Sequence, residues 1–124
     1  MLRALAVLIP LLTLLPAPVS AELRLLMIEQ PGCVYCASWN AEIAPIYPKT
    51  AEGRAAPLER VQLRGPYPDG IEIDRAPVFT PTFILLQDSR EAGRIEGYPG
   101  EDFFWGLLAQ MMIGTGEFKA EEIK

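Results

Sequence analysis

The two cysteines of this chain, Cys33 and Cys36, follow a short apolar run over residues 23–29. That run stops at the turn-forming residues Gln30-Pro31-Gly32, which is typical of a buried strand that enters a tight loop. The stretch 34–44 has few helix breakers and ends before a proline, so we expect a helix there. The cysteine pair therefore lies where a strand passes into a helix, and this placement restricts the fold more than any other feature of the sequence.

A cysteine in the first turn of a helix is well placed for thiol chemistry. The unpaired N–H groups and the positive end of the helix dipole stabilise a thiolate there and lower the pKa of the thiol. Cys33 is therefore the candidate nucleophile. Cys36 lies one turn further along and is the candidate resolving thiol, which attacks the mixed disulfide that Cys33 forms with a substrate.

Three other roles of the cysteine pair compete with redox chemistry. A structural disulfide across three residues closes a very short loop, and the entropic stabilisation of a disulfide grows with loop length. A zinc site needs about four ligands, and the chain has two cysteines and no histidine. A Cu(I) site of two thiolates is the non-enzymatic alternative that stays open, because soft ligands suit that ion. Our leading expectation is redox chemistry with no metal and no cofactor.

The composition narrows the function classes further. The chain has 124 residues, half of them apolar, which is enough for one small domain. Its formal net charge is -5, and no run of Lys or Arg forms a basic stripe, so we expect no nucleic-acid partner. The absence of histidine excludes catalysis that depends on an imidazole.

The first residues have the pattern of an export signal. Arg3 supplies a positive charge, the stretch 4–15 is apolar, and Val19-Ser20-Ala21 is a small-residue cleavage pattern. We expect a signal peptide over 1–21, cleaved after Ala21, and an exported domain over 22–124. A retained membrane anchor is the alternative, but the apolar run is shorter than the roughly 20 residues of a spanning helix.

The rest of the chain predicts alternating strands and helices. Thr50 begins a short helical turn that Gly53 weakens. We expect strands over 58–63, 82–87 and 93–98, an irregular stretch over 65–77, a turn over 88–91, and a last helix that starts at 99–102 and ends at Gly114 and Gly116. The apolar side chains of that helix recur at helical spacing and are expected to pack on the sheet: Phe104, Leu107, Leu108, Met111 and Met112.

Three motifs in order carry a family resemblance: 26–36, 80–83 and 93–98. A proline that opens a strand is tolerated in many proteins, so Thr80-Pro81 alone indicates no function. Together the motifs resemble the thioredoxin superfamily across nearly the whole mature chain. The resemblance implies an α/β thioredoxin-like fold, with a central mixed β-sheet flanked by helices in a single domain. It also implies that Pro81 is a cis-proline facing the cysteines and that Thr80 offers backbone hydrogen bonds to the substrate, in a groove bordered by Val34, Tyr35 and Gly97.

More narrowly, the stretches 30–36, 52–58 and 97–100 resemble the periplasmic thioredoxins of bacterial sulfur-oxidation gene clusters. That resemblance implies a periplasmic reductase that acts on a cysteine of a sulfur-carrier protein and takes electrons from a membrane thiol transporter. We expect a monomer. A disulfide oxidase or isomerase is the alternative within this class, since the sequence does not fix the redox potential.

Two departures from ordinary thioredoxins concern the site. Val34-Tyr35 stands between the cysteines in place of Gly-Pro, and Met27 occupies the position where thioredoxins usually bury an acidic residue. Proton transfer at Cys36 must then use water or another group. Glu29 lies two residues on and points to the same sheet face, so it is one substitute; a solvated acid at the end of a strand is the other interpretation.

Overall fold

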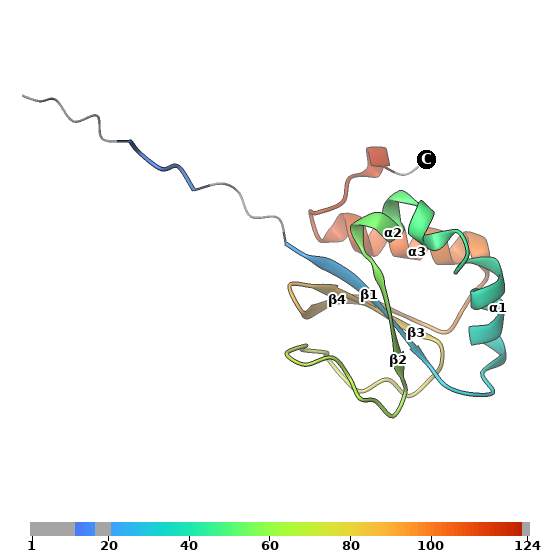
Figure 1. The fold of residues 1–124 in the computed structure, drawn as a ribbon. Helices are drawn as coiled ribbons and strands as arrows, with labels where there is room; N and C mark the ends of the chain where they lie inside the picture. The colour runs from blue at the N-terminus through green and yellow to red at the C-terminus, as the bar shows by residue number, and fades with distance from the viewer. Residues whose placement is uncertain (1–11, 17–20, 123–124) are drawn as a thin grey trace, which may run out of the picture.

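The computed structural model describes residues 12–16 and 21–122, and Figure 1 shows its fold. The predicted signal peptide over 1–21, with the cleavage pattern before Ala21, lies mostly outside the described residues. Within the described ranges, no helix is long and apolar enough to cross a membrane.

The elements follow the predicted order. They are β1 (Leu23–Glu29), α1 (Val34–Glu42), α2 (Ala51–Ala55), β2 (Leu58–Gln62), β3 (Thr82–Gln87), β4 (Arg90–Glu96) and α3 (Glu101–Gly114). Short 3-10 turns at Tyr47–Lys49 and Ala120–Glu122 follow α1 and α3. The strands expected over 23–29 and 82–87 are confirmed with the same bounds.

The four strands form one mixed sheet in the order β2-β1-β3-β4. β1 runs parallel to β2 and antiparallel to β3, and β3 runs antiparallel to β4. β1 is therefore hydrogen-bonded on both edges. The predicted mixed sheet flanked by helices is confirmed.

The hairpin between β3 and β4 is tighter than predicted. We expected a turn over 88–91 and a partner strand over 93–98, but β4 begins at Arg90. Asp88 and Ser89 both have positive φ angles, 49° and 67°, and form a two-residue turn. Positive φ at both central positions matches the twist of the flanking strands, so the hairpin closes within two residues.

Each face of the sheet has its own apolar layer. On one face, side chains of β1 and β3 pack with residues from α1, α2 and α3; on the other, a smaller cluster packs against the chain segment 63–73. Figure 1 shows the three α-helices together on one side of the sheet, with the connection between β2 and β3 on the other. Three side chains of the predicted irregular stretch and Leu63, which was predicted to end the strand over 58–63, thus cover a face of the sheet. The four partly buried side chains are Leu63, Tyr67, Ile71 and Ile73.

Trp39 of α1 lies at the centre of the larger cluster. Its ring centroid is 6.2 Å from that of Tyr47, 5.2 Å from Phe83 and 5.7 Å from Phe104. These contacts join α1 to β3 and to α3. Aromatic pairs at such distances add stability beyond their buried area.

The apolar positions of α3 divide between the core and solvent. Phe104, Leu108 and Met112 are fully buried, as expected, and Met111 is partly buried. Leu107 was expected to pack on the sheet but is 40% exposed. It precedes Leu108 by one residue, which turns its side chain about 100° around the helix and away from the sheet.

We predict that Gly53→Ala destabilises the protein although alanine favours helices. A Cβ at this position would lie 1.7 Å from the Tyr47 carbonyl oxygen, so the backbone would have to move. The free energy of unfolding, measured by chemical denaturation, should fall by about 1–3 kcal/mol. Gly106→Ala in α3 is the matched control: a Cβ there meets no atom within 4 Å, and stability should rise by up to about 1 kcal/mol. Equal effects of the two substitutions would contradict this explanation.

Candidate active site

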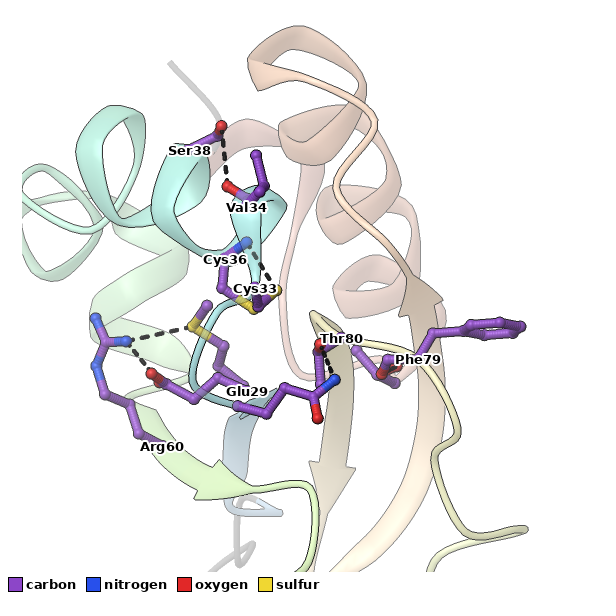
Figure 2. Close-up of a disulfide and its surroundings, with 11 residues drawn as sticks. Glu29, Cys33, Val34, Cys36, Ser38, Arg60, Phe79 and Thr80 are labelled. Atoms are coloured by element: carbon purple, nitrogen blue, oxygen red, sulfur yellow. Dashed lines mark hydrogen bonds and ion pairs between the residues drawn. A yellow bond between two sulfur atoms is a disulfide. The ribbon is translucent and has the colours of Figure 1, made fainter.

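Cys33 and Cys36 form a disulfide at the N-terminus of α1, with their Cα atoms 5.2 Å apart (Figure 2). The chain leaves β1 at Glu29 and turns at Gly32, whose φ of 77° is a left-handed conformation that favours glycine. Cys33 then takes the N-cap position of α1 with an extended backbone. The predicted passage from strand to loop to helix at the cysteines is therefore confirmed.

The two cysteines differ in exposure. Cys36 is 3% exposed and belongs to the larger core cluster. Cys33 is only partly buried and lines an open cleft. A thiol or disulfide of another molecule therefore meets Cys33 first.

The first turn of α1 favours negative charge at Cys33. The Cys36 backbone N–H donates to the Cys33 sulfur at 3.1 Å, and no acidic residue of this turn opposes the helix dipole. In the reduced protein the same amide can stabilise a Cys33 thiolate. This arrangement suits nucleophilic thiol chemistry.

The Thr80–Pro81 peptide bond is cis and immediately precedes β3. The Gln30 side-chain amide, from the turn before Cys33, donates to the Thr80 hydroxyl at 2.9 Å. Figure 2 shows Thr80 beside the disulfide. In the described part of the chain, Thr80 makes no backbone hydrogen bond to another backbone group, so its own backbone groups remain available to a bound segment.

The loop around Gly97 is tied to the same region. The Gly97 N–H donates to the Pro81 carbonyl oxygen at 2.7 Å, and Gly97 has a φ of 88°. The next residue, Tyr98, donates its hydroxyl to the Glu42 carboxylate at the end of α1. Burial, with the Glu42 carboxylate as a second cause, raises the pKa of Tyr98 well above its ordinary value, so this hydroxyl stays a donor. The predicted neighbours Pro81 and Gly97 are thus in direct contact.

Exposed apolar side chains lie between the two cysteines in sequence and before the cis-proline. Val34 and Tyr35 are 73% and 64% exposed, and Val78 and Phe79 are 70% and 60% exposed. Large apolar side chains left in solvent in this way are typical of a surface that contacts another protein. We call these four residues the apolar rim.

A charged pair lies on the other side of the disulfide from Thr80 and Phe79 (Figure 2). Arg60 of β2 contacts the Glu29 carboxylate at 2.7 Å, and its guanidinium lies 3.4 Å from the sulfur of Met27. The same guanidinium is 5.9 Å from the centroid of the Trp39 ring. Met27, where thioredoxins usually have an acid, is fully buried and has this arginine as a neighbour. Glu29 is therefore ion-paired, and its side chain is 20% exposed.

A cleft of about 380 Å³ opens beside the disulfide. Its lining residues come from β1, the turn and α1: Glu29, Gln30, Gly32, Cys33, Val34, Cys36, Ala37 and Asn40. Asn40 and Arg60 are not among the residues that the sequence predicted for the site. For Asn40, a polar residue one turn after Cys36 was an available signal. For Arg60, the contact with Met27 depends on the parallel register of β1 and β2, in which these two residues are partners.

Cys33 and Cys36 give this site the chemistry of thiols and disulfides. Within residues 12–16 and 21–122, no group of three or more His, Cys, Asp or Glu side chains is placed to hold a metal ion. Both thiols are joined in the disulfide. The pair can accept two electrons and return them to another thiol or disulfide.

Comparison with solved structures found a close match. The chain is similar to the periplasmic thioredoxin SoxS from Paracoccus pantotrophus, in its reduced form, with 62% sequence identity and a TM-score of 0.74. The match covers 76% of this chain and 99% of that one. No protein-family model and no curated protein matched the chain.

We predict that limited alkylation of the reduced protein modifies Cys33 before Cys36. Cys33 is the more exposed sulfur and lies at the helix N-terminus, which favours its reactive thiolate form. Iodoacetamide followed by peptide mass spectrometry should show Cys33 reacting about tenfold faster or more. Faster labelling of Cys36 would contradict this assignment, and labelling of the unfolded protein gives the intrinsic rates for comparison.

Proposed function

The chain belongs to the thioredoxin family, in its SoxS type, and we propose that it reduces a disulfide or a modified cysteine of a partner protein in the periplasm. Its thiol–disulfide oxidoreductase activity follows from this membership together with the Cys33–Cys36 pair. The observation that carries the proposal is the difference in exposure within the pair. Cys33 opens to the cleft while Cys36 is 3% exposed, so one sulfur is offered to a partner and the other is kept for the second step.

In the proposed reaction, the Cys33 thiolate attacks one sulfur of the partner disulfide. A bond forms between Cys33 and that sulfur, and the other partner sulfur leaves as a thiolate that takes up a proton. The Cys36 sulfur then attacks the Cys33 sulfur, which breaks the mixed disulfide and gives up the Cys36 proton. The partner leaves as a dithiol, and its two electrons come from the thiols of Cys33 and Cys36.

The substrate groove of this proposal lies between α1 and the cis-proline. Thr80 would pair its free backbone groups with an extended partner segment, next to Pro81. Val34 and Tyr35, with the rest of the apolar rim, would contact apolar side chains of the partner. Gly97 borders the groove through its hydrogen bond to Pro81. A protein substrate fits this surface better than a small thiol does, because the rim extends beyond the sulfur atoms.

The partner and the electron donor are proposed from the family. The similar protein is a SoxS thioredoxin, and the Sox sulfur-carrier protein is the substrate that this relationship favours. Electrons would reach Cys33 and Cys36 from a membrane thiol-electron transporter. Reduction is the direction of this scheme. An oxidase would run the same exchange in reverse, and an isomerase would rearrange the partner's disulfides without a net transfer of electrons.

Export and processing complete the proposal. The similar SoxS protein is periplasmic, and the segment 1–21 has the composition of a signal peptide that is removed after Ala21. β1 begins at Leu23, and the Glu22 backbone N–H donates to the Asp88 carboxylate at 2.9 Å. The mature chain from residue 22 would thus keep every strand of the sheet, and we propose that it acts as a monomer.

We predict a reducing potential for the Cys33–Cys36 couple. Equilibration with defined ratios of reduced and oxidised glutathione should give a value nearer the roughly -270 mV of thioredoxin than the roughly -120 mV of a strong oxidase. A reductant must be able to pass its electrons to partner disulfides, which requires the lower potential. A strongly oxidising value would overturn the proposed direction and favour the oxidase or isomerase.

We further predict that Cys36→Ser traps the partner. Without the resolving thiol, the mixed disulfide on Cys33 should accumulate in periplasmic extracts and appear as a complex that a reducing agent dissolves. Cys33→Ser is the matched control and should form no such complex, because Cys36 is buried.

Two results would contradict this proposal. Equal trapping by both variants would mean that Cys33 is not the attacking sulfur. Tight one-to-one binding of Cu(I) by the reduced wild-type protein, with no disulfide exchange toward insulin, would instead identify a copper-binding module.

A further inference from the structure

A buried oxygen atom beside the disulfide lacks a hydrogen-bond partner. The side-chain oxygen Oδ1 of Asn40 is buried and accepts no hydrogen bond from the described residues. Buried polar groups in folded proteins nearly always have a partner, so an exception requires an explanation. The indole N–H of Trp39 and one guanidinium nitrogen of Arg94 share this condition, but Asn40 is the one that lines the cleft together with Cys36.

Asn40 and Cys36 are neighbours on α1. They are four residues apart, which places side chains on the same helix face with Cβ atoms about 5–6 Å apart. The Cys36 sulfur carries no hydrogen in the disulfide, so it has nothing to donate. After reduction it carries an S–H group, which is a donor. Reduction of the disulfide therefore creates a donor four residues from the unpartnered Asn40 oxygen.

We propose that Asn40 is a positioning residue for Cys36, whose thiol donates a hydrogen bond to Asn40 Oδ1 in the reduced protein. This bond keeps the proton on Cys36 while Cys33 ionises at the helix N-terminus. The inference rests on the thiol–disulfide oxidoreductase activity of the pair and is independent of the direction proposed above.

The charges around Cys36 are consistent with this role. Glu29 is the one carboxylate among the residues that line the cleft, and Arg60 of β2 pairs with it at 2.7 Å. Met27, also on β1, is uncharged and fully buried. The remaining lining residues carry no charge, and the two cysteines are neutral in the disulfide. Asn40 is thus an uncharged acceptor on the helix that carries Cys36, while Glu29 is occupied by the arginine.

The proton and electron balance defines when the bond exists. A donor dithiol gives two electrons that break the Cys33–Cys36 bond, and one of its protons passes to Cys36, where Asn40 accepts the hydrogen bond. When Cys36 later attacks the mixed disulfide, its proton leaves with the departing partner thiolate. The bond is thus present in the dithiol and absent in the disulfide, so it stabilises the reduced form alone.

Removing the acceptor should therefore shift the couple toward the disulfide. In glutathione equilibria, Asn40→Leu, which keeps the size of the side chain, and Asn40→Ala should each shift the dithiol–disulfide ratio about fivefold to tenfold toward the disulfide. That shift corresponds to a potential about 20–30 mV lower. Asn40→Asp keeps an acceptor and should not lower the potential. Ser38→Ala is the control on the same helix and should leave the potential unchanged. The Ser38 hydroxyl donates to the Val34 carbonyl oxygen, and Ser38 does not line the cleft.

An unchanged potential in both Asn40→Leu and Asn40→Ala, with the oxidised proteins melting as folded chains, would overturn the proposal. An equal fall in Asn40→Asp would also overturn it, because the acceptor would then be irrelevant. Failure of the proposed reductase direction is a separate result, since it appears in the absolute potential of the wild-type protein and not in the difference between variants.

Discussion

The placement of β1 inside the sheet is the constraint on which the site depends. β1 is paired on both edges and buried on both faces, so its end at Glu29 and the turn that follows are held in place. The register of β1 and β3 pairs Ile28 with Thr82, which brings the Thr80–Pro81 bond close to the turn that leads to Cys33. Two segments about 45 residues apart in the chain are thereby joined at one end of the sheet.

Around the disulfide, the two sides differ in chemistry. Phe79 and Thr80 lie on one side and the Arg60–Glu29 pair on the other. The apolar rim is suited to contact with a partner protein, whereas the polar side holds the cleft next to Cys36. The two surfaces meet at Cys33 and Val34, which line the cleft and also border the apolar rim.

Local sequence patterns predicted the features that depend only on residues close together in the chain. β1 and β3 were predicted with the right bounds because they are continuous apolar runs between turn residues, and the cysteine pair predicted the site. The start of β4 could not be predicted, since positive φ at Asp88 and Ser89 is not a property of those residue types alone. The contact between Arg60 and Met27 depends on the register of β1 and β2, and the burial of the unpartnered Asn40 oxygen depends on packing. Neither feature can be predicted from the spacing of residues in the sequence.

The three α-helices share one side of the sheet with the disulfide, while the segment 63–73 covers the other side with four partly buried side chains. Mutational tolerance should therefore be unequal across the molecule. Length changes at the exposed turn formed by Asp69 and Gly70 alter this thin covering layer and spare the disulfide and the Thr80–Pro81 bond, which lies at the far end of the same connection. That turn is accordingly the place to attach a label or to graft a sequence without disturbing the thiols.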